Sequence, residues 1–405
     1  MKYVILLGDG MADLPLPELG QQTPLEAADK PRMDYLAQHG ACGLAKTVPE
    51  GMPPGSDTAN LAVMGYDPKQ YYSGRSPLEA VSLGIDLKED DVAYRCNLVT
   101  LSEEPDYGAR TMIDYCAGEI ETEDARQLIA VLQAELDTAG LRLYPGISYR
   151  HCLVRARALP GAVLTPPHDI TGQPIRDYLP GGDFGPCLLE WQRRSAAILA
   201  DHPINQARRA AGLNPANSAW FWGEGVRPRI PSFESLYGLK GGVICAVDLI
   251  KGLGICAGWQ HLPVPTATGG MVTDYRAKGR AALALLEAGC DLVYIHVEAP
   301  DECGHHGDTA AKIRAIEAID RELLAPLLDA LDEGGEDYAL LLTPDHPTPI
   351  PLKTHTGGPV PFVLYRSGGV SGPHASRYTE AECQKTGLYL PEGPLMMKKL
   401  VGNDF

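Results

Sequence analysis

The 405-residue sequence lacks the patterns that mark several large classes of protein. Its ten cysteines form no CxxC pair, which argues against a zinc ribbon and a thioredoxin-like redox site. Scattered cysteines in a chain of this length are typical of a reduced protein. The opening segment KYVILLGDG lacks the features of a signal peptide, and no apolar run reaches the length of a membrane span. We therefore expect a cytoplasmic protein.

The sequence also has fewer basic than acidic residues. Lysine and arginine together number 35 against 52 aspartates and glutamates, which gives a net charge of −17. This balance argues against binding to nucleic acid or to a membrane surface through bulk charge. A small anionic substrate remains open, because bound metal can invert the sign of the charge within one site.

Short apolar runs that end in Gly, Asp or Pro recur near both ends of the chain. The runs are YVILLGDG (3–10), GVICAVD (242–248), DLVYIHVEAPD (291–301), YALLLTPDH (338–346) and PFVLY (361–365). Continuous apolar runs separated by helical segments predict buried parallel strands. Helical spacing is clear over 274–289 and 309–335, and Pro326 is expected to kink or divide the second helix. The predicted fold class is α/β, with a mostly parallel sheet flanked by helices.

The sequence pattern in the middle of the chain differs from that of its flanks. Strand and helix patterns alternate from about residue 90 to 225, but Gly/Pro-rich segments separate them from their flanks. We interpret this block as a smaller α/β or α+β domain inserted into the first. The expected core domain comprises 1–88 and 230–405, and the inserted lid or substrate domain comprises 89–229.

Aspartates follow three of the predicted strands. Asp9 comes after VILLG, Asp301 after VYIHVEAP and Asp345 after ALLLTP. In an open parallel sheet, ligands bind outside the carboxyl ends of the strands. Three carboxylates at that edge would repel one another strongly unless a cation lay between them. Each aspartate alone would be an ordinary turn or cap residue, but the three together predict a metal site.

Histidines accompany these aspartates. His305 is four residues after Asp301, and His346 and His355 lie within eleven residues of Asp345. A mixture of imidazole and carboxylate ligands suits zinc, manganese or iron better than calcium or magnesium alone. Six such ligands are too many for one catalytic ion that keeps positions open, so we infer two ions. The neighbouring His306 is expected to be solvated.

Ser56 lies in the stretch PPGSDTANLAVMGYDP (53–68), just before a helix-like run. As an N-cap, its hydroxyl would accept a hydrogen bond from a free backbone N–H at the start of that helix. As a nucleophile, it would be activated by coordination to a divalent ion. The predicted metal site favours the nucleophile, and the two roles are compatible.

Several segments carry a family resemblance. They are LLGDGMAD, PPGSDTANLAVMGYDP, YYSGRSPLEA, YRCN, APDECGHHGD and PDHPTP…KTHTGGPVPF. Together they resemble the cofactor-independent phosphoglycerate mutases of the archaeal type, which belong to the alkaline phosphatase superfamily. The resemblance covers nearly the whole chain and implies an alkaline-phosphatase-like core. The segments TPPHDITGQPI, NPANSAWFWGEG and YGLKGGVICAVDLIKGLG resemble a bacterial subgroup that has also been proposed to act as homoserine kinase.

The resemblance implies a ligand set and a reaction. One metal would be held by Asp9, Ser56, Asp345 and His346, and the other by Asp301, His305 and His355. We expect two divalent ions, Mn²⁺ first, with Zn²⁺, Co²⁺ and Mg²⁺ as alternatives. Ser56 would take the phosphoryl group from 3-phosphoglycerate, and the 2-hydroxyl of the bound glycerate would recapture it. Closure of the inserted domain as a lid would keep water from the phosphoserine.

Substrate-binding groups are expected on the inserted domain and near its ends. The candidates are Arg75, Arg95, Asn97 and Lys251, followed by Arg150, His168 and Asp169. Arginine binds phosphate and carboxylate in a bidentate manner, whereas lysine acts as a point charge. For each residue, a structural role in a surface ion pair is the alternative.

Two other functions are kept open. The first is a homoserine kinase-like phosphotransferase with a nucleotide donor, although the sequence has no GxxxxGK[ST] motif and no dinucleotide fingerprint. The second is a phosphate- or metal-binding regulatory protein with a decayed site. It is disfavoured because every expected metal position holds a competent ligand. A sulfatase is disfavoured because no CxPxR pattern surrounds residue 56.

Overall fold

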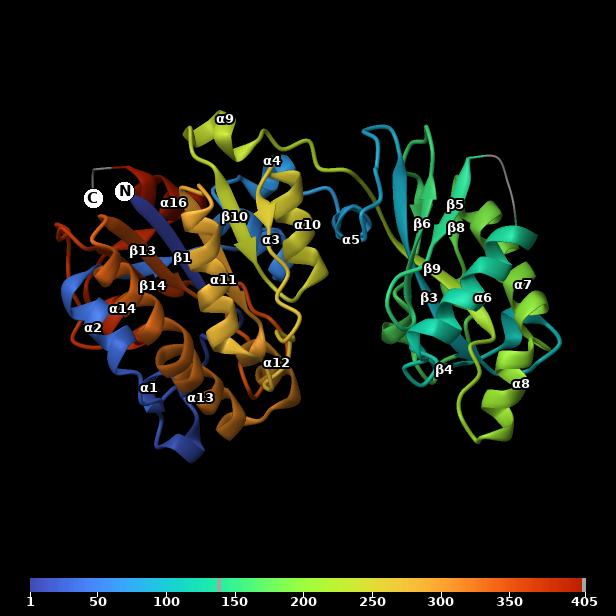
Figure 1. Ribbon diagram of the computed structural model, residues 1–405. Coiled ribbons are helices and arrows are strands. Elements are labelled where there is room, and N and C mark those ends of the chain that lie inside the picture. Colours follow the sequence, from blue (N-terminus) through green and yellow to red (C-terminus); the bar gives the residue numbers. More distant parts are fainter. Residues whose placement is uncertain (137–139, 403–405) are drawn as a thin grey trace. The chain divides into compact units, whose positions relative to one another are not determined.

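The computed structural model describes residues 1–136 and 140–402 (Figure 1). The chain divides into two compact units, one formed by Met1–Tyr72 with Ile230–Phe405 and the other by Ser73–Arg229. Both ends of the chain therefore build the first unit. Residues 137–139 and 403–405, which fall in the predicted domains 89–229 and 230–405, lie outside the described residues. Within the described ranges, no helix has both the length and the apolar character needed to cross a membrane.

The first unit is built on a sheet of eight described strands in the order β11-β10-β12-β1-β13-β14-β2-β15. Their bounds are β1 (Lys2–Gly8), β2 (Ala41–Ala45), β10 (Gly241–Ile244), β11 (Gln260–His261), β12 (Leu292–Val297), β13 (Tyr338–Thr343), β14 (Val360–Arg366) and β15 (Tyr389–Leu390). The pairings from β11 through β13 are all parallel, as is that of β2 with β15. The mostly parallel α/β fold predicted from the apolar runs is confirmed.

Strand β14 differs from the prediction. It runs antiparallel to both β13 and β2, so the interpretation of 361–365 as a parallel strand is wrong. The chain passes from β13 to β14 through residues 344–359, which contain no helix. A connection between parallel strands must carry the chain back to the end of the sheet where the first strand began, usually through a helix. A loop that stays at the end where the first strand finishes makes the next strand antiparallel. The polar residues of this loop therefore stay at the sheet edge where β13 ends.

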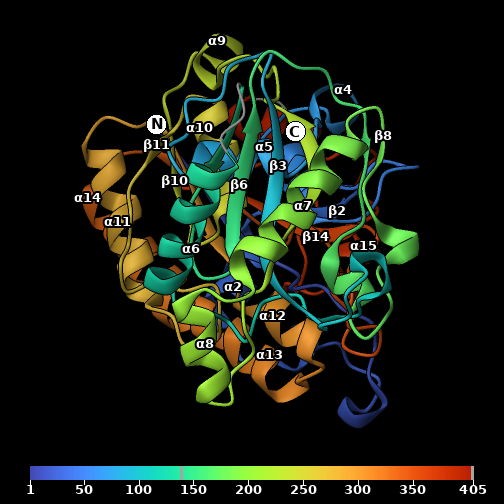
Figure 2. The ribbon, with the colours of Figure 1, turned by 90° about the vertical axis from the view of Figure 1, so that its right-hand side faces the viewer.

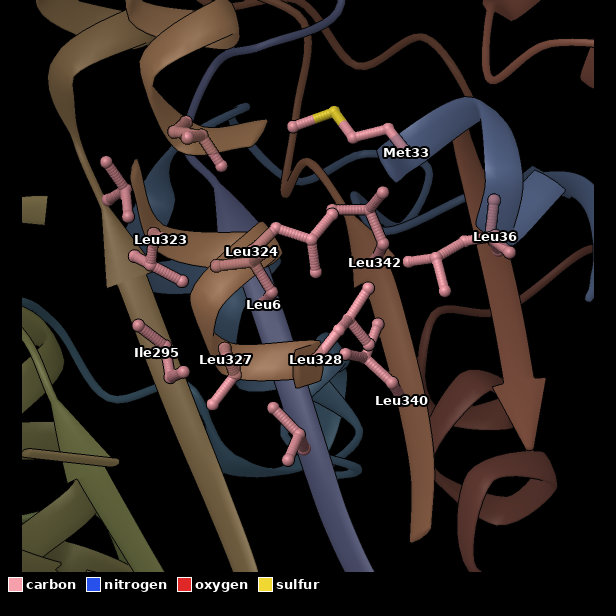
Figure 3. Packing of buried hydrophobic residues seen from close by; sticks show 14 of the residues in the cluster. Leu6, Met33, Leu36, Ile295, Leu323, Leu324, Leu327, Leu328, Leu340 and Leu342 are labelled. Atoms are coloured by element: carbon pink, nitrogen blue, oxygen red, sulfur yellow. The ribbon is translucent and has the colours of Figure 1, made fainter. Parts of the chain in front are cut away.

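Helices cover both faces of the sheet. Successive strand residues point to opposite faces, so a run such as Val4–Leu7, buried throughout, requires cover on both sides. On one face, Leu6 of β1 packs in a cluster with leucines that precede or lie within α14 (Ala325–Gly334) (Figure 3). The labelled members of this cluster are Leu6, Met33, Leu36, Ile295, Leu323, Leu324, Leu327, Leu328, Leu340 and Leu342. On the opposite face, Tyr294 of β12 contacts α3 (Ser56–Val63) through Asn60.

The helices of the first unit lie between and after its strands along the chain. They are α1 (Pro24–Ala27), α2 (Pro31–His39), α3 (Ser56–Val63), α4 (Pro68–Tyr71), α9 (Phe233–Tyr237), α10 (Asp248–Cys256), α11 (Tyr275–Glu287), α12 (Ala299–His306), α13 (Thr309–Ala318), α14 (Ala325–Gly334), α15 (Glu380–Lys385) and α16 (Pro394–Val401). The helical run predicted at 309–335 is interrupted by a π-helical turn, Ile319–Leu324, ahead of Pro326. Pro326 is the second residue of α14, which follows directly after this π-helical turn.

The second unit has an antiparallel sheet. Its strands run in the order β4-β3-β6-β5, and β9 pairs with the other edge of β3 for most of its length. The bounds are β3 (Val92–Leu101), β4 (Met112–Asp114), β5 (Leu141–Tyr144), β6 (Arg150–Arg155) and β9 (Ser218–Val226), with a separate pair β7 (Ala162–Val163) and β8 (Gly181–Gly182). Helices α6 (Thr122–Glu135) and α7 (Gly185–Leu199) pack on one face of this sheet (Figure 2), and α8 (Pro203–Ala210) follows α7.

Residues 73–88 belong to the second unit and not to the core domain in which the sequence analysis placed them. Helix α5 (Ser76–Ser82) packs on β3 and β9 of that unit. Ser73 Oγ donates a 2.8 Å hydrogen bond to the carbonyl oxygen of Val226, and Ser76 Oγ donates to that of Gly223. These partners lie about 150 residues further along the chain, which local composition does not reveal.

Candidate metal centre and anion-binding cluster

The three predicted aspartates lie at one edge of the first sheet. Asp9 follows β1, Asp301 lies in α12 just after β12, and Asp345 follows β13. Strands β12, β1 and β13 are neighbours, so parallel pairing carries all three residues to the same end. Each carboxylate is buried, with 1%, 5% and 0% of its residue exposed, respectively. Buried carboxylates need a positive partner or strong hydrogen bonds.

The expected imidazoles join these carboxylates in two overlapping groups. One group contains Asp9, Asp345 and His346, and the other contains Asp301, His346 and His355. Within each group, one nitrogen or oxygen atom per residue lies within 4.8 Å of the others. His346 belongs to both groups, whereas the expected ligand set gives it to one metal.

His305 completes the second group through its Nε2 atom. This atom lies 3.2 Å from Oδ2 of Asp301 and 2.9 Å from Nε2 of His355. Its Nδ1 lies 3.0 Å from the carbonyl oxygen of Lys353, which can only accept, so Nδ1 carries a hydrogen. Metal-ligating histidines typically donate one ring N–H to a group such as a backbone carbonyl, which orients the other nitrogen for the ion. The neighbouring His306 is exposed, as expected.

Thr348 orients His346. The Thr348 hydroxyl donates to Oδ1 of Asp301 over 2.5 Å, and it lies 3.3 Å from Nδ1 of His346. Because the hydroxyl hydrogen is used toward Asp301, its oxygen is free to accept the Nδ1 hydrogen of His346. Nε2 of His346 then presents its lone pair to Oδ2 of Asp345, 3.2 Å away, and to Oδ1 of Asp9, 3.6 Å away.

The electrostatics of the cluster call for positive charge. Burial, together with the nearby carboxylates of Asp345 and Asp301, raises the pKa of Asp9 well above its ordinary value. Oδ1 of Asp9 is buried without a hydrogen-bond partner. The hydrogen bond to Asp301 raises the pKa of His305 to about 9, so a proton occupies the position that a cation could take. Carboxylate oxygens and imidazole nitrogens with converging lone pairs fit divalent cations.

Ser56 lies beside this cluster. Its Oγ is 3.2 Å from Nε2 of His346. Helix α3 begins at Ser56 itself, and the N-cap residue is Gly55, which supplies no side-chain hydrogen bond. The N-cap interpretation of Ser56 is therefore wrong, and its hydroxyl faces the predicted metal ligands.

Gly10 is required for the approach of these ligands. Its φ of 60° lies in the left-handed region that favours glycine. A Cβ at this position would come within 2.6 Å of Oδ1 of Asp301 and 2.5 Å of the Thr348 hydroxyl. Its N–H donates to Oδ1 of Asp345 over 3.1 Å. The glycine thus lets the backbone after β1 hold one carboxylate while touching another.

Strand alternation assembles a second cluster in the second unit. Tyr94 and Cys96 of β3 face α6 and α7, so Arg95 and Asn97 point to the opposite face. Trp222 of β9 is the register partner of Arg95, and the Arg95 guanidinium lies 4.0 Å from the indole centroid. Burial, with the nearby Arg75 and Arg150 charges, lowers the pKa of Arg95 to about 10 despite the opposing effect of Glu79.

Asn97 and Glu79 hold this cluster in place. Asn97 is buried, accepts a 2.9 Å hydrogen bond from Nε1 of Trp222 and donates to the carbonyl oxygen of Tyr115. Glu79 bridges the two arginines, with 2.9 Å contacts to Nε of Arg75 and Nε of Arg95. Asn97 therefore orients the Trp222 indole, and Glu79 orients the two guanidinium groups.

The remaining predicted substrate residues are divided between the units. His168 packs edge-on against Trp222 at a centroid distance of 5.2 Å, and its Nε2 lies 3.5 Å from Oδ1 of Asp169. Arg150 is exposed and is the register partner of Asn97 on β6. Lys251 belongs to the first unit and lies on α10.

The sequence analysis missed Thr348, Trp222 and Glu79. Thr348 lies two residues after His346 in a segment already singled out, so its position was the available signal. Trp222 and Glu79 have no comparable signal, because their roles depend on partners 125 and 16 residues away, Asn97 and Arg95.

Comparisons with known proteins identify the family of this chain. The family model described as 2,3-bisphosphoglycerate-independent phosphoglycerate mutase matches residues 37–205. A protein of that name from Methanothrix thermoacetophila is 49% identical over 401 residues, covering 99% of this chain and all of the relative. A solved structure of a Pyrococcus horikoshii protein has a TM-score of 0.83 at 29% identity and covers 100% and 98% of the two chains.

A second solved structure carries the same family name. The cofactor-independent phosphoglycerate mutase from Thermoplasma acidophilum has a TM-score of 0.68 at 26% identity, and the match covers 99% of each chain. Both the sequence and the fold are thus shared over nearly the whole chain. The chain belongs to the family of 2,3-bisphosphoglycerate-independent phosphoglycerate mutases.

Proposed function

We propose that this chain interconverts 3-phosphoglycerate and 2-phosphoglycerate through a phosphoserine at Ser56. The observation that carries the proposal is the position of the Ser56 hydroxyl, 3.2 Å from Nε2 of His346 in a buried carboxylate and imidazole cluster. The names of the relatives support this substrate. The relatives described above carry the name of a mutase and do not support the homoserine kinase alternative.

The proposed ligands are those expected from the sequence. Asp9, Asp345 and His346 with Ser56 would hold one divalent ion, and Asp301, His305 and His355 the other. Mn²⁺ is the proposed ion, with Zn²⁺, Co²⁺ and Mg²⁺ as alternatives. When bound, the two ions would lower the pKa of the Ser56 hydroxyl and neutralise charge on the transferring phosphoryl group.

The proposed reaction has two balanced half-steps. In the first, Ser56 Oγ attacks phosphorus, the bond from phosphorus to the 3-oxygen breaks, and the serine proton ends on that oxygen. In the second, the 2-hydroxyl of glycerate attacks the phosphorus of the phosphoserine, the bond from phosphorus to Ser56 Oγ breaks, the hydroxyl proton ends on Oγ, and 2-phosphoglycerate leaves. The number of phosphate esters is unchanged, so no nucleotide and no water are consumed.

We further propose that the cluster of Arg75, Arg95, Arg150, His168 and Asp169 with Trp222 binds the anionic groups of the substrate. Arg95 is the main candidate because its guanidinium is oriented by Glu79 and by the indole, leaving N–H donors in a fixed geometry. Asn97 would act through Trp222. Lys251 and the lid role of the second unit stay predictions, as does a cytoplasmic location, which the ten free cysteines favour.

A coupled assay tests the function. The Mn²⁺-loaded protein should form 2-phosphoglycerate from 3-phosphoglycerate in the absence of nucleotide. Homoserine-dependent loss of ATP without mutase activity would instead establish the kinase alternative. Binding of Mn²⁺ with no phosphoserine trapped from any of these substrates would support a decayed site.

A further inference from the structure

Asn60 connects the serine helix to the carboxylate cluster. It lies one helical turn after Ser56 in α3 and is fully buried. Its Nδ2 donates a 2.8 Å hydrogen bond to the carbonyl oxygen of Ser56 and another 2.8 Å hydrogen bond to Oδ2 of Asp345. One side chain therefore touches both the backbone of the proposed nucleophile and a proposed metal ligand.

Tyr294 fixes the orientation of this amide. Its hydroxyl donates a 2.6 Å hydrogen bond to Oδ1 of Asn60, and Tyr294 is fully buried on β12. The carboxylate of Asp345 and the carbonyl of Ser56 can only accept hydrogen bonds, so the amide nitrogen must face them. Oδ1 is then left to accept from the tyrosine. A flipped amide would set one oxygen against two others and leave the tyrosine hydroxyl without its acceptor.

Asp345 is held from both sides by this arrangement. Its Oδ1 accepts from the backbone N–H groups of Gly10 and His346, at 3.1 and 2.9 Å. Asn60 holds Oδ2, the oxygen that also lies 3.2 Å from Nε2 of His346. The backbone donors hold Oδ1 of Asp345. Because the Asn60 amide holds Oδ2, the carboxylate cannot rotate about the bond that joins it to the rest of the side chain.

We propose that Asn60 and Tyr294 are positioning residues that set the distance between the Ser56 hydroxyl and the Asp345 carboxylate. The inference rests on the proposed function, because it takes Asp345 as a metal ligand and Ser56 as the nucleophile. Tyr294 acts through Asn60, and Asn60 acts through Ser56 and Asp345. Neither residue touches the substrate in this account.

The two residues should behave as one unit. Loss of a partner that orients a metal ligand typically weakens metal binding or activity by about 10- to 100-fold. We expect Asn60→Ala to weaken Mn²⁺ binding within that range and Tyr294→Phe by about 3- to 10-fold. The double variant should be no weaker than Asn60→Ala alone, because the tyrosine has no effect once its amide partner is gone.

The experiment uses the full chain stripped of metal with a chelator. Mn²⁺ affinity is measured by calorimetry, the Co²⁺-substituted proteins are compared by visible absorption, and kcat and KM are measured after loading with Mn²⁺. The matched control is Tyr378→Phe. Tyr378 is also fully buried and donates a 2.9 Å hydrogen bond, but to the carbonyl oxygen of Pro361. Unfolding of each stripped variant reports the effect on the fold alone.

For Tyr294→Phe we expect weaker Mn²⁺ binding, an altered Co²⁺ spectrum and a lower kcat, with KM within about two-fold of the wild-type value. For Tyr378→Phe we expect none of these changes. The proposal is overturned if Tyr294→Phe matches wild type in all three, or if the double variant shows the product of the two single effects. If the wild-type protein binds Mn²⁺ and is active, and Tyr294→Phe has the same Mn²⁺ affinity, spectrum and kcat, then this inference is rejected and the proposed function is retained. A wild-type protein that binds no Mn²⁺ rejects the metal centre and this inference with it.

Discussion

Nε2 of His305 lies 2.9 Å from Nε2 of His355, and both nitrogens face Asp301 at 3.2 and 3.4 Å. Two ring nitrogens this close need either a shared proton or a shared cation. We expect removal of metal to lower the unfolding midpoint, and Mn²⁺ at 100 times its Kd to restore about 2.7 kcal/mol per site. Calorimetric unfolding at several Mn²⁺ concentrations measures this, with His306→Ala, at an exposed neighbour, as the control. A midpoint that does not depend on Mn²⁺ would contradict the expectation.

The Ser56→Ala variant separates chemistry from metal binding. We expect turnover to fall by at least about a thousand-fold, because the proposed nucleophile is gone. The fold should be retained, because Ser56 supplies no side-chain cap to α3. Coupled assays, metal analysis and a search for trapped phosphoserine measure the three effects. Retained turnover in Ser56→Ala would reject the covalent route.

Trp222 should govern substrate affinity through Arg95. In Trp222→Phe, the hydrogen bond to Asn97 is lost and the ring face beneath the guanidinium shrinks. Cation–π contacts of this kind contribute about 0.5–2 kcal/mol, so KM for 3-phosphoglycerate should rise by roughly 2- to 30-fold with little change in kcat. Trp191→Phe is the control, since Trp191 packs on the helix-covered face of the same sheet. Equal KM values for the two variants would argue against an anion site at Arg95.

His151 predicts an acid sensitivity of the second unit. It is buried on β6, its Nδ1 accepts from the N–H of Gly146, and burial lowers its pKa to about 3. Between pH 6.5 and pH 3 the unfolded chain binds a proton that the folded unit does not. This stability is therefore complete above pH 6.5 and declines as the pH falls, by about 1.4 kcal/mol per pH unit.

The His151→Asn variant tests this origin, because an amide oxygen can accept the Gly146 hydrogen without titrating. Urea unfolding at pH 7 and pH 5 should show a smaller loss for His151→Asn than for wild type. Three of the four tryptophans, at 191, 220 and 222, lie in this unit and report its unfolding by fluorescence. His202→Asn, at the N-cap of α8, serves as the control. Identical pH dependence in His151→Asn and wild type would exclude His151 as the source.

The core strands were predictable because burial on both faces leaves a continuous apolar run. Strands β1, β12 and β13 are such runs, and the aspartates after them converge because neighbouring parallel strands end at one edge. Strand β2, ACGLA, is short and contains a glycine, so it gave no comparable signal. The direction of β14 depended on the path of residues 344–359, which the pattern within the strand does not encode.

The side chains that orient the site could not be predicted in the same way. Asn60 and Trp222 gain their roles from partners far away in sequence, and each residue type is also common in purely structural positions. The N-cap of α3 was also not predictable from residue preference, although the two candidate residues are adjacent. Serine is a strong N-cap residue, yet here Gly55 takes that place and turns the Ser56 hydroxyl toward the cluster.

The proposed ligand positions are spread along the chain from residue 9 to residue 355, on either side of the second unit in sequence. A ribosome must therefore finish nearly the whole polypeptide before the last imidazole can join the first carboxylate. Ions taken up during synthesis would find only partial sets of ligands. We therefore expect ions to load the proposed centre only in the completed chain.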